Sequence, residues 1–228
     1  MNDFRIKVAG LVVSLSADYP PAESLYSDFR TDAKADVEIN LTDEDLDFEY
    51  VSSRGSVIVK GFRVLHKISE AFIEYDVLLG HGAVIAHNGW AYMFSAASGT
   101  GKTTHIYKWL DHLPDSFIVN GDKPFLKIFD DIHPPLACGS PWAGKENGYT
   151  NTMVPLKAII CMERAEDNII RQISFSEAFP FVYQQTYRPN DEKKLRKTLK
   201  LLQRLSDTVE FYHFKCNNFK DDCFDVAY

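Results

Sequence analysis

A glycine-rich stretch near the middle of the chain has the composition of a phosphate-binding loop. The pattern [AG]-x-x-x-x-G-K-[ST] is met with Ala96, Gly101, Lys102 and Thr103 at the fixed positions. Glycines in such a loop let backbone N–H groups face a phosphate without an obstructing Cβ. The lysine offers a charge to the outer phosphates, and the threonine hydroxyl can bind Mg²⁺. A plain glycine-rich turn capped by a serine is the alternative. The expected phosphate contacts are Ala97, Ser98, Gly99, Thr100, Gly101, Lys102, Thr103 and Thr104.

The segments around this loop predict how it is positioned. Two apolar runs, residues 83–86 and 90–94, flank Asn88-Gly89, and Asn-Gly is a strong hairpin signal because both turn residues take positive φ. The strand that enters the loop is therefore expected to pair antiparallel with the one just before it, unlike the parallel βαβ arrangement of GTPase-like sheets. Residues 102–113 read as the following helix, which ends at Pro114.

The rest of the chain predicts a mixture of strands and helices. Strands are expected within residues 4–17, 36–42, 48–61 (a hairpin around Arg54-Gly55), 116–122, 125–129, 154–164 and 208–216. Helices are expected at 62–79, at 175–187 with a break near Pro180, and at 190–207. In the last helix Leu195, Leu199 and Leu202 have core-facing spacing.

Composition limits the classes of function. The 228 residues carry a formal net charge of −7, which disfavours a nucleic-acid surface, and the basic run 193–200 is expected to be the solvated face of a helix. No apolar run approaches the roughly 18 residues of a membrane span, so no membrane partner is expected. The four cysteines form no C-x-x-C pair and no metal-ligand spacing with the seven histidines. A reduced, cytoplasmic protein is the expectation.

The motifs together resemble a known bacterial family. SGTGKTT is similar to the nucleotide loop of phosphoenolpyruvate carboxykinases, and the segment order resembles the catalytic domain of HPr kinase/phosphorylase: a His-Gly pair, a hairpin, the loop, and a strand that ends in acidic residues. Here these are His81-Gly82, Asn88-Gly89, residues 96–103 and Asp122. SGTGKTTH, NGDKP, PWAGKE and VPLKAI also look very similar to motifs of small, poorly characterised relatives of HPr kinase. The resemblance spans roughly residues 80–165.

This resemblance implies an α/β (α+β) fold with an HPr kinase-like nucleotide-binding core. One domain, 1–228, would comprise a β-rich N-terminal layer (1–62) and the loop-containing core with C-terminal helices (63–228). The implied activity is transfer of the γ-phosphoryl group of ATP, or of another nucleoside triphosphate, to a hydroxyl group with Mg²⁺. The acceptor would be a serine or threonine of a peptide or protein, or a small metabolite.

The resemblance also implies residue roles. Lys102 would hold the phosphates, Thr103 and Asp122 the metal, and Asp122 or His81 would take the acceptor's proton. The family's E-x-R-G signature is absent, and its nearest stand-ins in this sequence are Lys145 and Glu146. A cation opposite the transferred group would come from Lys145 or from Arg164. Arg188 is expected to end a helix rather than to join the site, and Trp142 to fill the core.

Three functions stay open from the sequence. The first is a kinase. The family has two successive aspartates where this chain has Gly121-Asp122, and the missing aspartate favours the second function, a nucleotide sensor or scaffold that transfers no phosphate. A phosphorylase is the third. The sequence names no acceptor, and it leaves open whether the protein forms a homo-oligomer.

Overall fold

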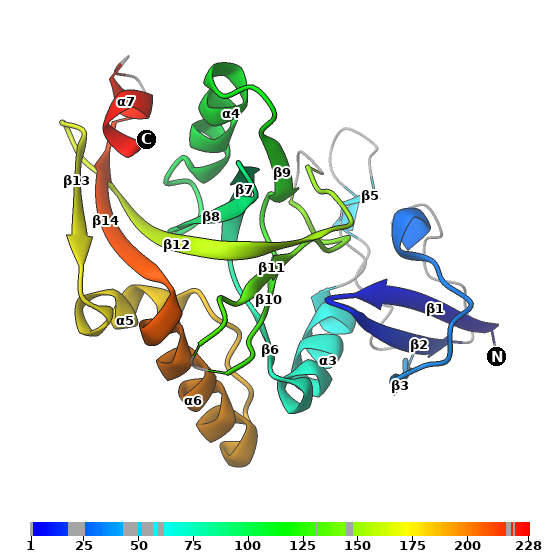
Figure 1. Cartoon of the computed structure of the whole chain (residues 1–228). Coiled ribbons are helices and arrows are strands. Elements are labelled where there is room, and N and C mark those ends of the chain that lie inside the picture. The colour runs from blue at the N-terminus through cyan, green and yellow to red at the C-terminus, as the bar shows by residue number, and fades with distance from the viewer. Residues whose placement is uncertain are drawn as a thin grey trace.

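A computed structural model describes residues 2–17, 26–42, 50–51, 57–58, 62–130, 132–144, 148–217, 220 and 222–228. The fold is a mixed α+β arrangement of sheets and helices (Figure 1). The strands are β1 (Asn2–Val8), β2 (Leu11–Ala17), β3 (Val37–Asn40), β4 (Tyr50–Val51), β5 (Val57–Ile58), β6 (Val77–Leu79), β7 (Gly82–His87), β8 (Trp90–Ser95), β9 (Phe117–Asn120), β10 (Phe125–Lys127), β11 (Leu136–Cys138), β12 (Met153–Arg164), β13 (Ile169–Ile173) and β14 (Glu210–Cys216). The α-helices are α3 (Phe62–Phe72), α4 (Lys102–His112), α5 (Phe175–Gln184), α6 (Glu192–Thr208) and α7 (Cys223–Ala227), with 3₁₀ turns η1 (Ser27–Phe29) and η2 (Ile73–Tyr75).

Strand β12 organises the main sheet, which has the order β6-β10-β11-β12-β8-β7-β9. The first residues of β12 pair antiparallel with β11, and the rest pairs in parallel with β8 and with β14. In Figure 1 β12 crosses the molecule, with β7 and β8 above it and β10 and β11 below it. Strand β8, which leads into the glycine-rich loop, therefore lies between antiparallel β7 and parallel β12.

Helices cover both faces of this sheet because its strands carry apolar residues on each side. Ala83 and Ile85 of β7 face a core built with α4 and α7, whereas Val84 and Ala86 face a core built with α5 and α6. This alternation is the two-residue period of a strand. The loop that precedes α4 is thus attached to a helix with a firmly packed inner face.

A smaller sheet, β1-β2-β3, packs against α3. Its buried side chains, such as Ile6 and Leu15, share a core with Leu65 and Phe72 of the helix and with Trp142. The N-terminal strands and the pairing of β4 with β5 are as predicted, although the turn expected at Arg54-Gly55 lies outside the described residues. Trp142 fills the core, as expected.

Several sequence-based expectations were wrong in detail. The helix expected to continue to residue 79 ends earlier, and β6 follows it; β11, β13 and α7 were not anticipated. Helix α5 runs through Pro180 without a break. A proline inside a helix removes a single N–H donor, and the capping box of Ser174 and Glu177 stabilises the start of this helix.

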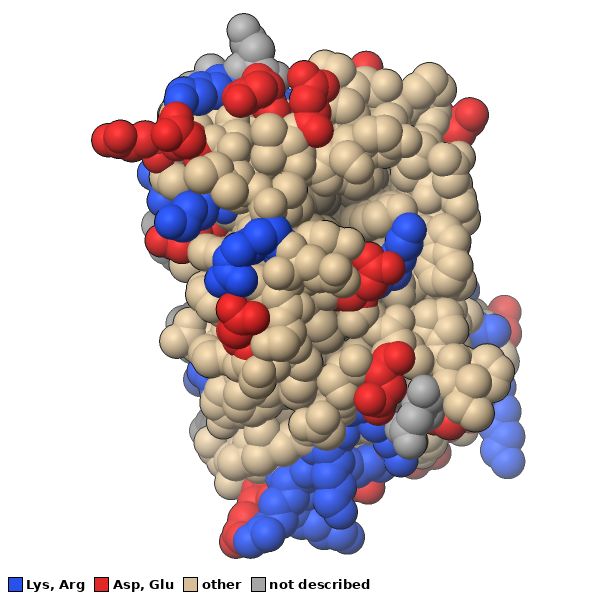
Figure 2. Space-filling model, turned by 60° about the vertical axis from the view of Figure 1, so that its left-hand side comes forward, with Lys and Arg blue, Asp and Glu red and all other residues tan. Residues whose placement is uncertain are grey.

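Helix α6 has a different buried face from the one predicted. Leu202 is buried, but Leu199 is exposed, and Leu201 and Leu205 complete the buried stripe. The basic run is solvated in part: Lys193, Arg196 and Lys200 are exposed, as predicted. Lys194 and Lys197 are instead half-buried, and they pair with Glu70 and Asp76. Figure 2 shows Lys and Arg side chains gathered at the lower end of the molecule, where α6 lies. Among the described residues, no helix combines the length and the apolarity needed to cross a membrane.

Candidate functional site

The hairpin before the glycine-rich loop is confirmed. Strands β7 and β8 pair antiparallel from Gly82↔Ser95 to His87↔Trp90, and the turn residues Asn88 and Gly89 have φ of 50° and 80°. The loop runs from the end of β8 to Lys102, the first residue of α4, and two of its glycines, Gly99 and Gly101, have φ of 80° and 109°. Both values lie in the region that favours glycine.

The Lys102 ammonium is folded back onto the loop itself. Its Nζ donates to the carbonyl oxygens of Ala96 at 2.8 Å and Ala97 at 3.2 Å. The side chain is buried, and burial lowers the pKa of Lys102, with the charge of Lys123 acting in the same direction and that of Asp122 opposing it. The cation is therefore partly desolvated beneath the loop, where an anion would bind it strongly.

Asp122 is held in place by a buried asparagine. The Oδ1 of Asn120 accepts hydrogen bonds from the backbone N–H groups of Asp122 and Lys123, at 2.9 and 2.7 Å, which is an Asx turn. The amide of Asn120 donates in turn to the carbonyl and hydroxyl oxygens of Ser140. The carbonyl of Asp122 accepts from the N–H of Gly82 at 3.0 Å, which ties the acidic residue to the start of β7.

Four side chains meet at this point, and together they carry an excess of positive charge. Asp122 Oδ1 lies 3.2 Å from His81 Nε2 and 3.5 Å from Lys123 Nζ, and Lys102 Nζ lies 3.5 Å from the same His81 nitrogen. With neutral His81, two ammonium groups face one carboxylate. Burial alone would raise the pKa of Asp122, but the hydrogen bond from His81 and the charge of Lys123 outweigh it and hold the pKa below its usual value.

The contacts assign the proton of His81. Nε2 cannot both donate to Asp122 and accept from Lys102, and the carboxylate is the stronger partner. Nε2 therefore carries the proton and donates to Asp122, while Lys102 donates to the loop carbonyls. The shortest contacts of Asp122 use Oδ1; Oδ2 faces Gly144, where an added Cβ would lie 3.8 Å from it.

The structure brings some of the predicted residues together and is silent on others. His81, Lys102 and Asp122 form one cluster, and Lys145 and Glu146 lie outside the described residues. Thr103 is half-buried in the first turn of α4, beside exposed Thr104; Ala97, Ser98 and Gly99 are exposed and Thr100 is half-buried. The guanidinium of Arg164 donates to the carbonyl of Gly99. Arg188 instead binds the last carbonyls of α5, as expected of a residue that ends a helix.

Sequence reasoning missed two members of the site, Asn120 and Lys123. Both lie in the N-G-D-K-P segment, and a signal for each was present. An asparagine two residues before an aspartate in a glycine-containing turn is a frequent Asx-turn former. Lys123 adjoins the acidic residue in sequence, but only the pairing of β9 with β7 shows that it faces the loop lysine.

Comparison with known proteins adds little to this geometry. No protein-family model matches the sequence, and no curated protein matches it. The solved structure of the HPr(Ser) kinase/phosphatase from Coxiella burnetii is similar at 10% sequence identity with a TM-score of 0.31, over 56% of this chain and 90% of that one. A TM-score this low supports no argument about function, so the proposal below depends on the residues of the site.

Proposed function

We propose that the protein binds a nucleoside triphosphate through the loop at residues 96–103 and transfers its γ-phosphoryl group to a hydroxyl group. The observation that carries the proposal is the cluster beneath the loop: Lys102 and Lys123 face the single carboxylate of Asp122, within contact of His81. Its surplus positive charge favours a polyanion. The start of α4 adds the positive end of a helix dipole at the same place.

Lys102 would change partners when phosphate enters. In the structure its ammonium satisfies the carbonyl oxygens of Ala96 and Ala97, so binding replaces neutral acceptors with charged phosphate oxygens. Charge-assisted hydrogen bonds are shorter and about twice as strong as neutral ones. Exchange of partners rather than burial of a new charge is therefore the expected event, and the lysine is already desolvated.

Asp122 is positioned to accept the proton of the attacking hydroxyl. Its Oδ1 is engaged by His81 and Lys123, which leaves Oδ2 for the acceptor. A carboxylate with a lowered pKa is a weak base, but phosphoryl transfer has a loose transition state in which the nucleophile loses its proton late. His81 would act as the positioning residue that keeps Oδ1 oriented.

Mg²⁺ fits the oxygen donors that this site offers. The hydroxyl of Thr103 and the carboxylate of Asp122 are hard ligands of the kind that Mg²⁺ prefers. When bound, the ion would neutralise charge on the phosphates. Thr103 would hold it from the first turn of α4, and Asp122, in the turn after β9, through a water molecule, because its Oδ2 serves the acceptor.

One observation favours a second function, a nucleotide sensor without transfer activity. The position before Asp122 is Gly121, and a Cβ added there would lie 2.8 Å from the carbonyl oxygen of Ala143. A second aspartate cannot be placed there unless the neighbouring loop moves. The site is therefore limited to one carboxylate at this position. A single carboxylate is compatible with a sensor that only binds nucleotide, and any transfer would depend on Asp122 alone.

The test separates binding from transfer. Purified protein is incubated with γ-labelled ATP, Mg²⁺ and an extract that contains candidate acceptors, while nucleotide affinity is measured by calorimetry. Lys102→Met is expected to lose both nucleotide binding and transfer. Asp122→Asn is expected to keep nucleotide binding, with a transfer rate reduced by a factor of about 10²–10⁴. Lys193→Met and Asp130→Asn are the matched controls, since both residues are exposed.

Each outcome decides between the two functions. Nucleotide binding without label on any acceptor would favour the sensor. Transfer by Asp122→Asn at the parental rate would refute the role of Asp122. Absence of nucleotide binding by the parental protein would refute both functions.

A further inference from the structure

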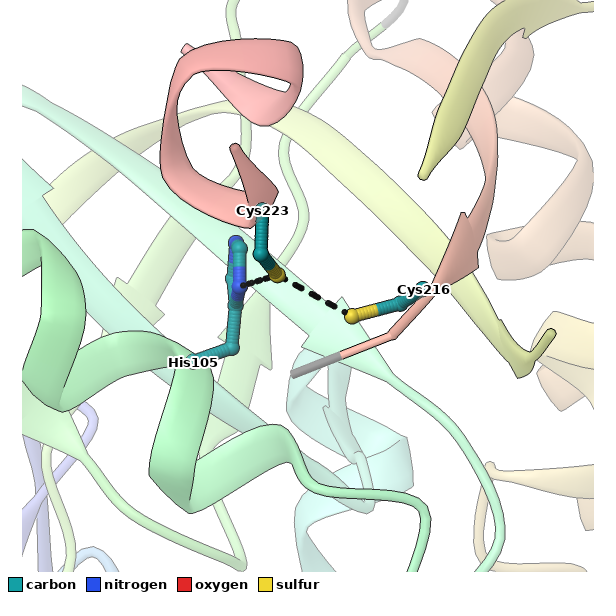
Figure 3. A group of neighbouring side chains, drawn as sticks. All are labelled: His105, Cys216 and Cys223. Atoms are coloured by element: carbon teal, nitrogen blue, oxygen red, sulfur yellow. Dashed lines mark hydrogen bonds between the residues drawn. The ribbon is translucent and has the colours of Figure 1, made fainter. Parts of the chain in front are cut away.

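A second group of reactive side chains lies in the core against the inner face of α4, one turn along the helix from Lys102. His105 of α4, Cys216 at the end of β14 and Cys223 at the start of α7 are all buried. The two sulfur atoms lie 3.3 Å apart, and Cys223 Sγ lies 3.4 Å from His105 Nδ1 (Figure 3). No sequence pattern predicts this group, because His105 lies 118 residues before Cys223 and only the fold brings them together.

A hydrogen bond from Trp109 distinguishes between the chemistries that such a group can perform. The indole Nε1–H, which can only donate, points at His105 Nε2 at 3.3 Å. Nε2 is therefore the acceptor, and the proton of the neutral ring sits on Nδ1, where it donates to Cys223 Sγ. A metal ion on Nδ1 would require the proton on Nε2, facing the indole N–H. The three ligand atoms lie within 4.8 Å of one another, but the hydrogen bond from Trp109 to His105 fits a thiolate at Cys223 better than a metal ion.

The two cysteines are unequal in character. The hydrogen bond with Cys216, and then that from His105, hold the pKa of Cys223 below its usual range although burial opposes them. The same bond to Cys223, together with burial, raises the pKa of Cys216. Cys223 is thus the better nucleophile, and Cys216 is a protonated thiol in contact with it.

We propose that Cys223 and Cys216 form an oxidisable dithiol site that reacts with hydrogen peroxide and closes to a disulfide. The Cys223 thiolate attacks one peroxide oxygen. The S–O bond forms as the O–O bond breaks, hydroxide is released, and Cys223 becomes a sulfenic acid. The sulfur of Cys216 then attacks the Cys223 sulfur; the S–S bond forms, the S–O bond breaks, and the hydroxyl leaves as water with the proton of Cys216. Peroxide is the two-electron oxidant in the balance.

The geometry makes the second step easy and the first step slow. A disulfide has an S–S distance of about 2.05 Å, so the sulfurs need to approach by only roughly 1.2 Å. Peroxide must first reach a buried sulfur. Helix α7 has five residues, and a cavity of about 230 Å³, lined in part by Val226, Ala227 and Trp109, lies beside it. Local opening of so short a helix is the expected route.

The experiment counts thiols in the reduced full chain during exposure to hydrogen peroxide, with peptide mapping by mass spectrometry. The expected product has lost two hydrogen atoms and contains one disulfide, between Cys216 and Cys223, which dithiothreitol reverses. Cys138 and Cys161 serve as internal controls: they are buried, and burial raises the pKa of each to about 12, so both stay reduced.

Variants test the order of the steps. Cys216→Ser is expected to stop at a sulfenic acid on Cys223 that a dimedone probe captures, and Cys223→Ser to give neither product. His105→Gln is expected to raise the pKa of Cys223 and so to slow the first step at a pH below that pKa, by up to about tenfold for each unit of the rise. Cys161→Ala is the control and should oxidise like the parent.

Three results would overturn the proposal. The first is oxidation of Cys138 and Cys161 as fast as that of the pair. The second is a pair that stays reduced in folded protein but oxidises in urea, which would make these cysteines inert core residues. The third is stoichiometric uptake of Zn²⁺ by the reduced protein, lost in Cys223→Ser, which would make the group a metal site.

Discussion

Two glycines of this protein have the same φ and equally open surroundings, but only one of them lies in the proposed phosphate loop, which permits a controlled test of that loop. Gly99 in the loop and Gly89 in the hairpin turn both have φ of +80°, and a Cβ added at either meets no atom within 4 Å. Alanine in this left-handed region costs about 1–2 kcal/mol, offset in part by the lower entropy of the unfolded chain. Gly99→Ala and Gly89→Ala should therefore be destabilised equally.

The magnitude follows from the size of the chain. For 150–250 residues a loss of 1 kcal/mol lowers Tm by about 2–4 °C, and this is the expected drop for both variants without ligand. Nucleotide at a hundredfold excess over its Kd raises the free energy of unfolding by about 2.7 kcal/mol, so the Tm of the parental protein should rise by about 5–11 °C.

Ligand should separate the two variants. The methyl group of Gly99→Ala stands in the open space before the loop, where backbone N–H groups are to approach the phosphates. Gly89→Ala should keep the full rise in Tm with Mg²⁺ and ATP, and Gly99→Ala should lose most of it. The assay is thermal unfolding of each variant with and without nucleotide. An equal rise in both variants would refute the reasoning that the loop backbone wraps the phosphates.

Three further results are expected. Gly144→Ala should lower Tm more than Gly89→Ala, since its φ is +81° and its Cβ would lie 3.1 Å from that of Asp122; it should also reduce transfer, as thermal unfolding and the labelled-ATP assay would show. The lowered pKa of Asp122 contributes stability that is fully present above its ordinary value of 3.8 and is lost as pH falls through the folded-state pKa; urea midpoints between pH 2 and 6 should therefore fall less steeply in Asp122→Asn, and parallel curves would contradict this. Leu202→Ala should cost about 2–5 kcal/mol and exposed Leu199→Ala less than about 1 kcal/mol in urea unfolding, and equal costs would mean that α6 packs by another face.

The parts of the fold that the sequence predicted are those with local causes. The hairpin at Asn88-Gly89 needs two adjacent residues of a particular type, and the helix after Gly101 needs a loop pattern and a periodic apolar face. Strands β6 and β11 are three residues long and exist through their partners β10 and β12. No local pattern marks such strands, because short apolar runs also fit helices and loops.

The candidate site divides in the same way. Lys102 was found from the linear motif, whereas its neighbourhood depends on tertiary structure. Asp122 reaches the lysine because β9 pairs with the outer edge of β7, and the Asx turn of Asn120 then fixes the backbone after that strand. Spacing in the sequence carries no information on that pairing, so the desolvated charge of Lys123 could not be anticipated.

Helix α4 shows why burial patterns alone mislead at such places. Its inner face buries Ile106 and Trp109, as an amphipathic helix should, but also Lys102 and His105. A buried polar side chain costs stability unless it is bonded, and each of these is: the lysine to the loop carbonyls, the histidine to Trp109 and Cys223. One turn of helix thus commits two polar groups to separate clusters, one below the glycine-rich loop and one against α7. Buried polar groups with specific partners are typical of functional sites rather than of an apolar core. Because α4 contributes such a group to each cluster, substitutions in this helix can perturb both.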